Sequence, residues 1–369
     1  MTKPCLIIST IGTSLLTNGA DENQRMRLRD TANFLKGALN AVDQSLIDQR
    51  QKHAMGVLAQ GLSHAKKESA ELNGIIAWYG GSIPKDCRDL HYLVHTDTAQ
   101  GGVAAEVVRN WLNNNGLQCQ VELISGLRVD DPKRINQPLA ILAHWVAKLT
   151  KGYRDSHRVV FHLSGGFKSI TGFMQVAGML YADEIVYIFD QGYLMRIPRL
   201  PLALDQGVHD VLSQYSNFFR RLMIHEILNV NEIPEEPTLQ LFIERECDFA
   251  SLSPWGVLCC EQWRQVCYKK EVLLPPSARI EFGHGFSRSC KDLAPVRIEA
   301  INNRIDQLDA FLASKGMNNP TSLDYKQIKG GAAQGSTHEA DAWSDGDARR
   351  LYMHKEGDVL IIDRLGAHL

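Results

Sequence analysis

The first 204 residues of the sequence predict an α/β fold built around a mainly parallel sheet. Apolar runs of strand length alternate there with segments whose apolar residues recur at helical spacing. These runs are apolar throughout, which is typical of parallel strands that helices cover on both faces. The later sequence changes character twice, and at roughly 100–200 residues per domain a chain of 369 residues is expected to divide. We therefore expect three parts: residues 1–204, a helical connector at 205–277, and a small α+β domain at 278–369.

The elements of the first part define where a ligand would bind. The predicted strands are the apolar runs at residues 6–11, 74–79, 120–124, 158–163 and 184–189. The predicted helices lie between them, at residues 103–114, 138–149 and 170–180. Together these elements predict a doubly wound sheet, in which ligands bind beyond the carboxyl ends of the strands.

Two of these strand ends carry residues suited to phosphate. Hydroxyl groups and a glycine follow the first strand, at Thr10, Gly12, Thr13 and Ser14. A glycine pair, a lysine and a serine follow the fourth predicted strand and lead into a helix, at Gly165, Gly166, Lys168 and Ser169. The free N–H groups of a helix N-terminus and a lysine together predict a phosphate cradle. Each loop alone also fits an ordinary helix cap, and neither matches G-x-x-x-x-G-K-[ST] or G-x-G-x-x-G.

The middle of the chain, residues 205–277, is acidic and is predicted to be helical. It contains eleven Asp or Glu and six Lys or Arg, a net charge of −5. Helical spacing at residues 211–222 and 255–263 predicts two amphipathic helices, and the prolines of LLPPSAR predict a hinge into the last part. Arg220 and His225 match R-x-x-x-x-H, the catalytic signature of HEPN ribonucleases, although this pattern also arises by chance.

The last part, residues 278–369, combines one long helix with several strands. Residues 279–282 predict a strand, and residues 296–313 predict an amphipathic helix. Four later segments alternate or run apolar like strands: LDYKQIKGG, STHEADAWS, ARRLYMHKEG and DVLIIDRLG. The Glu356-Gly357-Asp358 step predicts a hairpin, so we expect an antiparallel sheet.

Composition excludes several classes of protein. A hydrophobic fraction of 44% with 22% charged residues is ordinary for a globular chain and excludes disordered and fibrous proteins. A net charge of −2 argues against broad electrostatic binding to nucleic acid, so we expect no DNA partner. No apolar run reaches membrane length, so we expect a cytoplasmic protein with no membrane partner. The eight cysteines contain no C-x-x-C pair, which predicts reduced thiols and no metal site.

The two loops of the first part resemble a known family. T-x-G-T-S-L-L-T-N after one strand and S-G-G-F-K before a later helix resemble the CARF domain of CRISPR-associated proteins, over residues 1–200. The resemblance implies a Rossmann-like sheet and a homodimer that binds a cyclic oligoadenylate, cyclic tetra-adenylate, across its two-fold axis. It places Thr10, Gly12, Thr13 and Ser14 on the floor of the site and Gly165, Gly166, Lys168 and Ser169 on phosphate. Some members of the family also cut the ring, and the sequence leaves this activity open.

The last part resembles the RelE superfamily of toxin ribonucleases, over residues 279–369. The shared features are a strand, a helix, a K-x-L-K-G-like turn at 326–330, an acidic strand, R-x-L-Y at 349–352, and a terminal G-x-H. Such toxins cut mRNA in the ribosomal A site. The resemblance implies that Arg350, helped by Arg349, neutralises the phosphate, that His368 is the acid, and that Glu339 or His338 is the base. Trp343 and Tyr352 either stack on a base of the message or belong to the faces of the sheet.

The combined resemblances imply a cyclic-oligoadenylate-activated, ribosome-dependent mRNA endoribonuclease of type III CRISPR immunity. Attack by the 2′-OH without metal or other cofactor would leave a 2′,3′-cyclic phosphate. Residues 279–369 carry twelve basic and thirteen acidic side chains, so counterion release contributes little to ribosome affinity. Two alternatives remain: a CARF–HEPN ribonuclease that uses Arg220 and His225 on free RNA, and a non-catalytic ligand-sensing regulator.

Overall fold

The computed structural model divides the chain into two compact units, Met1–Ala203 and Leu204–Leu369. It describes residues 3–128, 135–189, 192–200, 202–224, 228–328 and 335–367. The segment predicted as a connector, residues 205–277, lies in the second unit together with residues 278–369. Within the described ranges, every helix is too short or too polar to cross a membrane.

The first unit is built on a six-stranded sheet in the order β3-β2-β1-β4-β5-β6. Its strands are β1 (Cys5–Thr10), β2 (Leu90–His95), β3 (Gln118–Leu123), β4 (Arg158–His162), β5 (Glu184–Ile188) and β6 (Leu194–Pro198). All neighbouring strands are parallel except β6, which runs antiparallel to β5. The order reverses between β1 and β4, as in doubly wound folds. The structure thus confirms the predicted α/β class and the parallel sheet.

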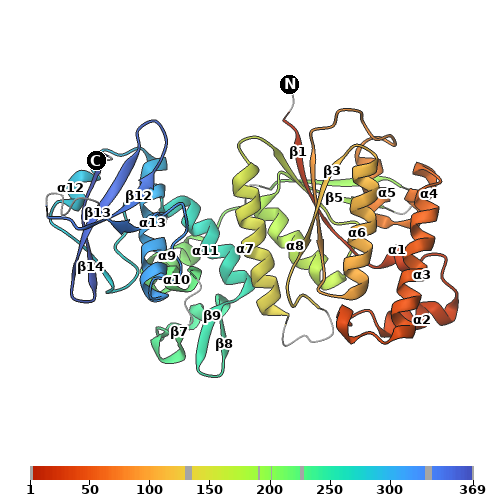
Figure 1. Cartoon of the computed structure of the whole chain (residues 1–369), viewed down its shortest axis with the longest axis horizontal. Helices are drawn as coiled ribbons and strands as arrows, with labels where there is room; N and C mark the ends of the chain where they lie inside the picture. The colour runs from red at the N-terminus through yellow and green to blue at the C-terminus, as the bar shows by residue number, and fades with distance from the viewer. Residues whose placement is uncertain are drawn as a thin grey trace. The chain divides into compact units, whose positions relative to one another are not determined.

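Helices cover both faces of this sheet (Figure 1). Before β2 the chain forms α1 (Ser14–Thr17), α2 (Glu22–Asp30), α3 (Ala41–Leu58), α4 (Leu62–Glu68) and α5 (Ala70–Trp78). Three longer helices follow, α6 (Ala99–Asn114), α7 (Asn136–Tyr153) and α8 (Lys168–Tyr181). The core on one face joins α5 and α6 to Leu93, and Trp145 of α7 packs edge-on against Tyr92 on the other face. Burial on both faces explains why most strands of this sheet read as apolar runs.

One predicted strand of the first unit is wrong, and two strands, β2 and β6, were not predicted. Residues 74–79, predicted as a strand, lie mainly in α5, because a short apolar run does not distinguish a buried helix from a buried strand. The sequence of β2, LHYLVH, carries two histidines that interrupt the apolar pattern, and that of β6, LMRIP, carries an arginine and a proline. The other predicted strands and helices are confirmed, with shifted ends.

The first part of the second unit is less helical than predicted. It contains α9 (Gln206–Gln214), α10 (Ser216–Met223), β7 (Leu228–Asn229), β8 (Ile243–Glu246), β9 (Phe249–Leu252) and α11 (Pro254–Cys267). The strands form a small antiparallel sheet in the order β7-β9-β8. In the hairpin, Glu246 pairs with Phe249, and Cys247 adopts a positive φ of 52°. The helical segments predicted at 211–222 and 255–263 are confirmed, the first in α9 and α10 and the second in α11. The small sheet was not predicted, because the sequence lacks the Asn-Gly or Asp-Gly pair that usually marks such a turn.

The rest of the second unit is a five-stranded sheet packed on one long helix. Its strands are β10 (Ile280–Phe282), β11 (Lys326–Gln327), β12 (His338–Trp343), β13 (Arg349–Glu356) and β14 (Val359–Ala367), in the order β10-β14-β13-β12-β11. The helices are α12 (Phe286–Ser289) and α13 (Pro295–Ala313), and α13 shares a buried core with one face of the sheet. The pairs are antiparallel except β10 with β14. The predicted helix, strands and hairpin are confirmed.

A buried ion pair links α10 to α13 within the second unit. Arg220 is fully buried, and its Nε and Nη2 atoms lie 2.8 and 2.7 Å from Asp306 Oδ1. Arg220 also donates to the carbonyl oxygen of Leu274, and Tyr268 donates to Asp306. Burial raises the pKa of Asp306, although Arg220 opposes this effect. Arg220 therefore belongs to the core of the unit, and it has no free face for RNA.

Candidate functional site

The two predicted loops of the first unit meet at the point where the strand order reverses. β1 and β4 are neighbours, yet the chain continues from them to opposite sides of the sheet. The loops beyond their carboxyl ends therefore flank a crevice in which doubly wound proteins bind ligands. Thr10 Oγ1 donates to the carbonyl oxygen of Gly165, and this bond ties the two loops together.

The glycines of these loops allow the backbones to touch. A Cβ atom on Gly12 would lie 2.9 Å from the backbone nitrogen of Gly166. A Cβ atom on Gly165 would overlap the side chain of Glu71, and Gly166 has a φ of +105° that other residues rarely adopt. The structure thus brings Thr10, Gly12, Gly165 and Gly166 together.

Glu71, which the sequence analysis did not single out, places a carboxylate between the loops. It lies in α5 and is only 1% exposed. Its Oε1 accepts a hydrogen bond from the backbone N–H of Gly12 at 2.8 Å, and its Oε2 accepts one from Ser69 Oγ at 2.7 Å. The N–H of Gly12 is consequently engaged by the protein itself. An acidic residue inside the apolar segment AELNGIIAW was the one signal that could have identified it.

The remaining predicted residues form the outer part of this site. Lys168 and Ser169 are exposed and begin α8, where the first N–H groups of the helix lack intrahelical partners. Thr13 is half-buried and caps α1 without a side-chain hydrogen bond. The buried Ser14 Oγ has no hydrogen-bond partner among the described residues. The site therefore has a packed inner layer and an outer layer at the start of α8, where Lys168 and Ser169 are open donors.

Two buried histidines lie on the α5 face of the sheet beneath these loops. His162 Nδ1 is 3.1 Å from Ser9 Oγ, and His91 Nε2 is 2.9 Å from the hydroxyl of Tyr79. Burial lowers the pKa of His162 to about 4 and that of His91 to about 3. Both side chains are neutral at pH 7, so they add no positive charge for an anionic ligand.

In the second unit, the structure brings Arg350 and Glu339 together. Arg350 Nη1 lies 2.6 Å from Glu339 Oε1, and Arg350 Nη2 lies 3.2 Å from Asp341 Oδ1. These side chains project from β13 and β12, and Arg350 is only 8% exposed. Two carboxylates thus already neutralise the guanidinium that was predicted to bind phosphate.

The other predicted catalytic residues do not join this cluster. His338 and Arg349 are adjacent to Glu339 and Arg350 in their strands, so their side chains point to the opposite face. His338 stacks on Tyr325, and burial lowers its pKa. Arg349 pairs with Asp347 at 3.1 Å. His368, the predicted acid, lies outside the described residues, as does His225 of the alternative motif.

The two predicted stacking residues belong to the packed faces of the sheet. Tyr352 is fully buried and donates its hydroxyl to the carbonyl oxygen of Ala367. Trp343 is buried, its Nε1 donates to the carbonyl oxygen of Asp347, and the guanidinium of Arg297 lies 4.6 Å from its ring centre. Neither ring has an open face for a nucleobase, so the alternative of sheet-face aromatics is correct.

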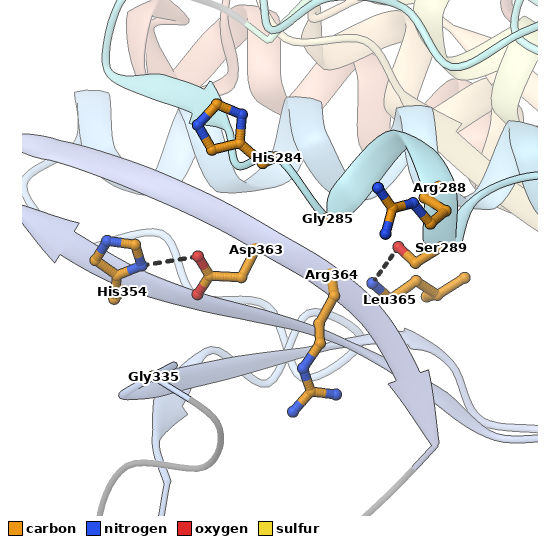
Figure 2. A pocket seen from close by; sticks show the side chains of 9 residues that line it. All are labelled: His284, Gly285, Arg288, Ser289, Gly335, His354, Asp363, Arg364 and Leu365. Carbon is orange, nitrogen blue, oxygen red and sulfur yellow. Dashed lines mark hydrogen bonds and ion pairs between the residues drawn. The ribbon is translucent and has the colours of Figure 1, made fainter.

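A pocket of about 470 Å³ between α12 and the β13–β14 hairpin was not predicted (Figure 2). His354 Nδ1 lies 2.8 Å from Asp363 Oδ1, and Asp363 Oδ2 accepts a hydrogen bond from Ser336 Oγ at 2.6 Å. Hydrogen bonds to Asp363 and Glu356 raise the pKa of His354. His284 and Arg288 line the same pocket. These residues come from separate segments and form no sequence motif.

Comparison with protein families identifies one matching region. Residues 66–200 match the family model described as "CRISPR-associated protein (Cas_APE2256)". The matched region includes Glu71 and the loop from Gly165 to Ser169, and it ends before the second unit begins. It thus connects the first unit with CRISPR-associated proteins, as the motifs of its loops predicted.

Proposed function

We propose that the chain is a cyclic-oligoadenylate-activated endoribonuclease of type III CRISPR immunity. The first unit would bind the ring, and the second unit would cut mRNA on the ribosome. The observation that carries this proposal is the meeting of the two predicted loops at the reversal of strand order, with the second loop inside a region similar to a CRISPR-associated family.

The outer layer of the first site suits the phosphates of such a ring. Lys168 supplies a full positive charge, and the N-terminus of α8 supplies N–H donors beside it. A cyclic tetra-adenylate repeats its phosphates symmetrically. An isologous homodimer would present two identical sets of donors to opposite phosphates, so we propose that two copies share one ring.

RNA cleavage by the second unit rests on its element order and on the side chains of its sheet. The strand, long helix and antiparallel strands follow the order that resembles RelE-type toxins. Metal-independent cleavage needs a base for the 2′-OH, an acid for the leaving 5′-oxygen and cations for the phosphate. The pocket between α12 and the β13–β14 hairpin is lined by histidines, a carboxylate and arginines, side chains that suit these three roles.

The test is a cleavage assay with full-length, ligand-free protein. Translating ribosomes and protein-free RNA are each incubated with and without cyclic tetra-adenylate, and the new RNA ends are mapped and tested for 2′,3′-cyclic phosphate. We expect cleavage only when ribosomes and ligand are both present. Ligand-dependent cleavage of free RNA would instead favour the HEPN-type alternative, whose Arg220 is buried in an ion pair. Ligand binding without any cleavage would favour the non-catalytic regulator.

A further inference from the structure

We propose that the pocket between α12 and the β13–β14 hairpin is the phosphodiester-cleaving site of the second unit, with His354 as general acid and His284 as general base. The inference rests on the proposed function, because it assumes that this unit cuts RNA. It moves the chemistry away from Arg350, the residue that the sequence favoured. Figure 2 shows His284, Arg288, His354 and Asp363 in this pocket.

The charges around Arg350 and Arg288 differ. Arg350 is enclosed by Glu339 and Asp341, so a phosphate approaching it would also meet two carboxylates. Arg288, by contrast, is exposed and forms no ion pair with any residue that the structure describes. It lines the pocket together with Arg364, two histidines and the carboxylate of Asp363, and the exposed carboxylate of Glu356 lies beside His354 at the hairpin. An anion therefore has a favourable place here and an unfavourable one at Arg350.

Hydrogen bonds fix the orientation of His354. Asp363 lies against Nδ1 of the imidazole, and Ser336 holds the other oxygen of that carboxylate. A carboxylate on one ring nitrogen fixes the ring and favours a proton on each nitrogen, as in histidine–carboxylate pairs of other hydrolytic sites. Nε2 lies 3.2 Å from Glu356 Oε1, an exposed side chain at the hairpin. When Glu356 turns away into solvent, Nε2 can give its proton to a substrate oxygen.

Two hydrogen bonds from backbone N–H groups hold the walls of the pocket together. The backbone N–H of Leu365 donates to Ser289 Oγ at 2.8 Å, and the N–H of Gly283 donates to the carbonyl oxygen of Ile362 at 2.9 Å. These bonds fix α12 and the loop before it against β14. His284 lies in that loop, so it faces the pocket from a different wall than His354 (Figure 2).

The reaction then follows without a metal. His284 takes the proton of the 2′-OH, and the 2′-oxygen forms a bond to phosphorus. The bond from phosphorus to the 5′-oxygen breaks, and that oxygen takes the proton from His354 Nε2. Arg288 stabilises the negative charge that develops on the phosphate. The products are a 2′,3′-cyclic phosphate and a 5′-hydroxyl, and the exchange of protons leaves His284 charged and His354 neutral.

The test uses full-length protein, cyclic tetra-adenylate and ribosomes stalled on a defined mRNA, under single-turnover conditions. His354→Gln and His284→Gln should each slow cleavage by about 100-fold or more, the range of general acid–base catalysis. Arg288→Ala should slow it by at least about tenfold. His64→Gln and Arg245→Ala, which change exposed residues elsewhere, serve as matched controls and should cleave like wild type.

A modified substrate separates a catalytic role of His354 from a structural one. Sulfur in place of the 5′-oxygen at the cleaved bond makes a leaving group that needs no proton. His354→Gln should recover near wild-type rates on this mRNA, whereas His284→Gln should remain slow. If wild type cleaves and both histidine variants cleave equally well, the inference is wrong while the proposed function stands. Slow cleavage by His354→Gln on both substrates excludes the acid role, and no cleavage by wild type overturns both proposals.

Discussion

The two units hold their positively charged side chains in different ways. In the first unit Lys168 is exposed at the start of α8, beside loops whose interior carboxylate, Glu71, binds a backbone N–H and a hydroxyl. In the second unit Arg350 is buried against two carboxylates, whereas Arg288 is exposed in a pocket with His354. The comparison teaches that access and surroundings, more than residue type, decide which cation can bind a phosphate. Each prediction below tests one side of this contrast.

The largest expected effect belongs to Arg350. Arg350→Ala would leave the carboxylates of Glu339 and Asp341 beside a vacated, buried position, and breaking a buried ion pair in this way typically costs about 3–5 kcal/mol. The free energy of unfolding, from urea titrations of the full chain, should fall by that order. Arg288→Ala should change it by less than about 0.5 kcal/mol, since its side chain is exposed.

These two variants also separate loss of folding from loss of chemistry. If the Arg350→Ala protein has the same free energy of unfolding as wild type but cannot cleave RNA, Arg350 has the catalytic role that the sequence suggested. Equal destabilisation by Arg288→Ala would contradict the distinction between a buried and an open arginine.

Lys168 tests the open cation of the first unit. A charge-assisted hydrogen bond from Lys168 to a ligand phosphate contributes about 1.5–3 kcal/mol, so Lys168→Ala should weaken binding of cyclic tetra-adenylate by tens-fold. Calorimetric titration measures this directly. Lys52→Ala, a change at another exposed lysine of the same unit, is the control and should bind normally. Undiminished affinity of a folded Lys168→Ala protein would remove Lys168 from the site.

Glu71 tests the inner layer of the same site. Glu71→Ala removes the acceptor of the Gly12 N–H, and an unsatisfied buried donor costs about 1–3 kcal/mol. Glu71→Gln keeps an acceptor oxygen for Gly12 and can donate its amide to Ser69 Oγ, so its cost should be smaller. Thermal unfolding with and without ligand compares the two. If Gln destabilises as much as Ala, the negative charge of Glu71 matters beyond its hydrogen bonds.

The same contrast explains what could be predicted from the sequence. The loops of the first unit are contiguous and follow strands, so their meeting follows from the topology of a parallel sheet. Glu71 reaches them from a helix 59 residues away from Gly12, and the pocket residues His284, His354 and Asp363 come from separate segments. Such contacts depend on tertiary packing and leave no local spacing in the chain.

The wrongly predicted strand in the first unit has a local cause. Residues 74–79 were predicted as a strand because this part of α5 is a short apolar run. The run is apolar because α5 packs closely against the sheet, where Gly74 lies directly against His162 of β4. The buried ion pair of the second unit shows the same limit of local spacing. Arg220 matched a catalytic motif, but its partner Asp306 is 86 residues away and neutralises it.

The smallest effect is the pH response of the second unit, which should be opposite to that of the first unit. His91 and His162 have lowered pKa values, about 3 and about 4, because they are buried in neutral form. The unfolded chain binds protons at these histidines below about pH 6.5, whereas the folded chain binds them only near pH 4 and below. The free energy of unfolding of the first unit should therefore be highest near pH 7 and should fall as pH falls toward 4. His354 has a raised pKa because of Asp363 and Glu356. The stability that charged His354 gives the second unit is fully present below the pKa that this histidine has in the unfolded chain. It is lost as pH rises through the pKa that the histidine has in the folded chain.

Amide hydrogen exchange, corrected for intrinsic rates, locates each effect in the chain. Between pH 7 and pH 5, peptides from β1 and β4 should lose protection. Over the same range, peptides from β13 and β14 should gain protection in wild type relative to His354→Gln. His338 has a lowered pKa and acts in the opposite direction. Because both proteins contain His338, the comparison between them cancels its contribution. The gain should be slight, since His354 is partly exposed and water screens its ion pairs. Equal protection of the β13 and β14 peptides in wild type and His354→Gln at pH 5 would mean that Asp363 does not hold His354 charged, and would remove the physical basis for its role as an acid.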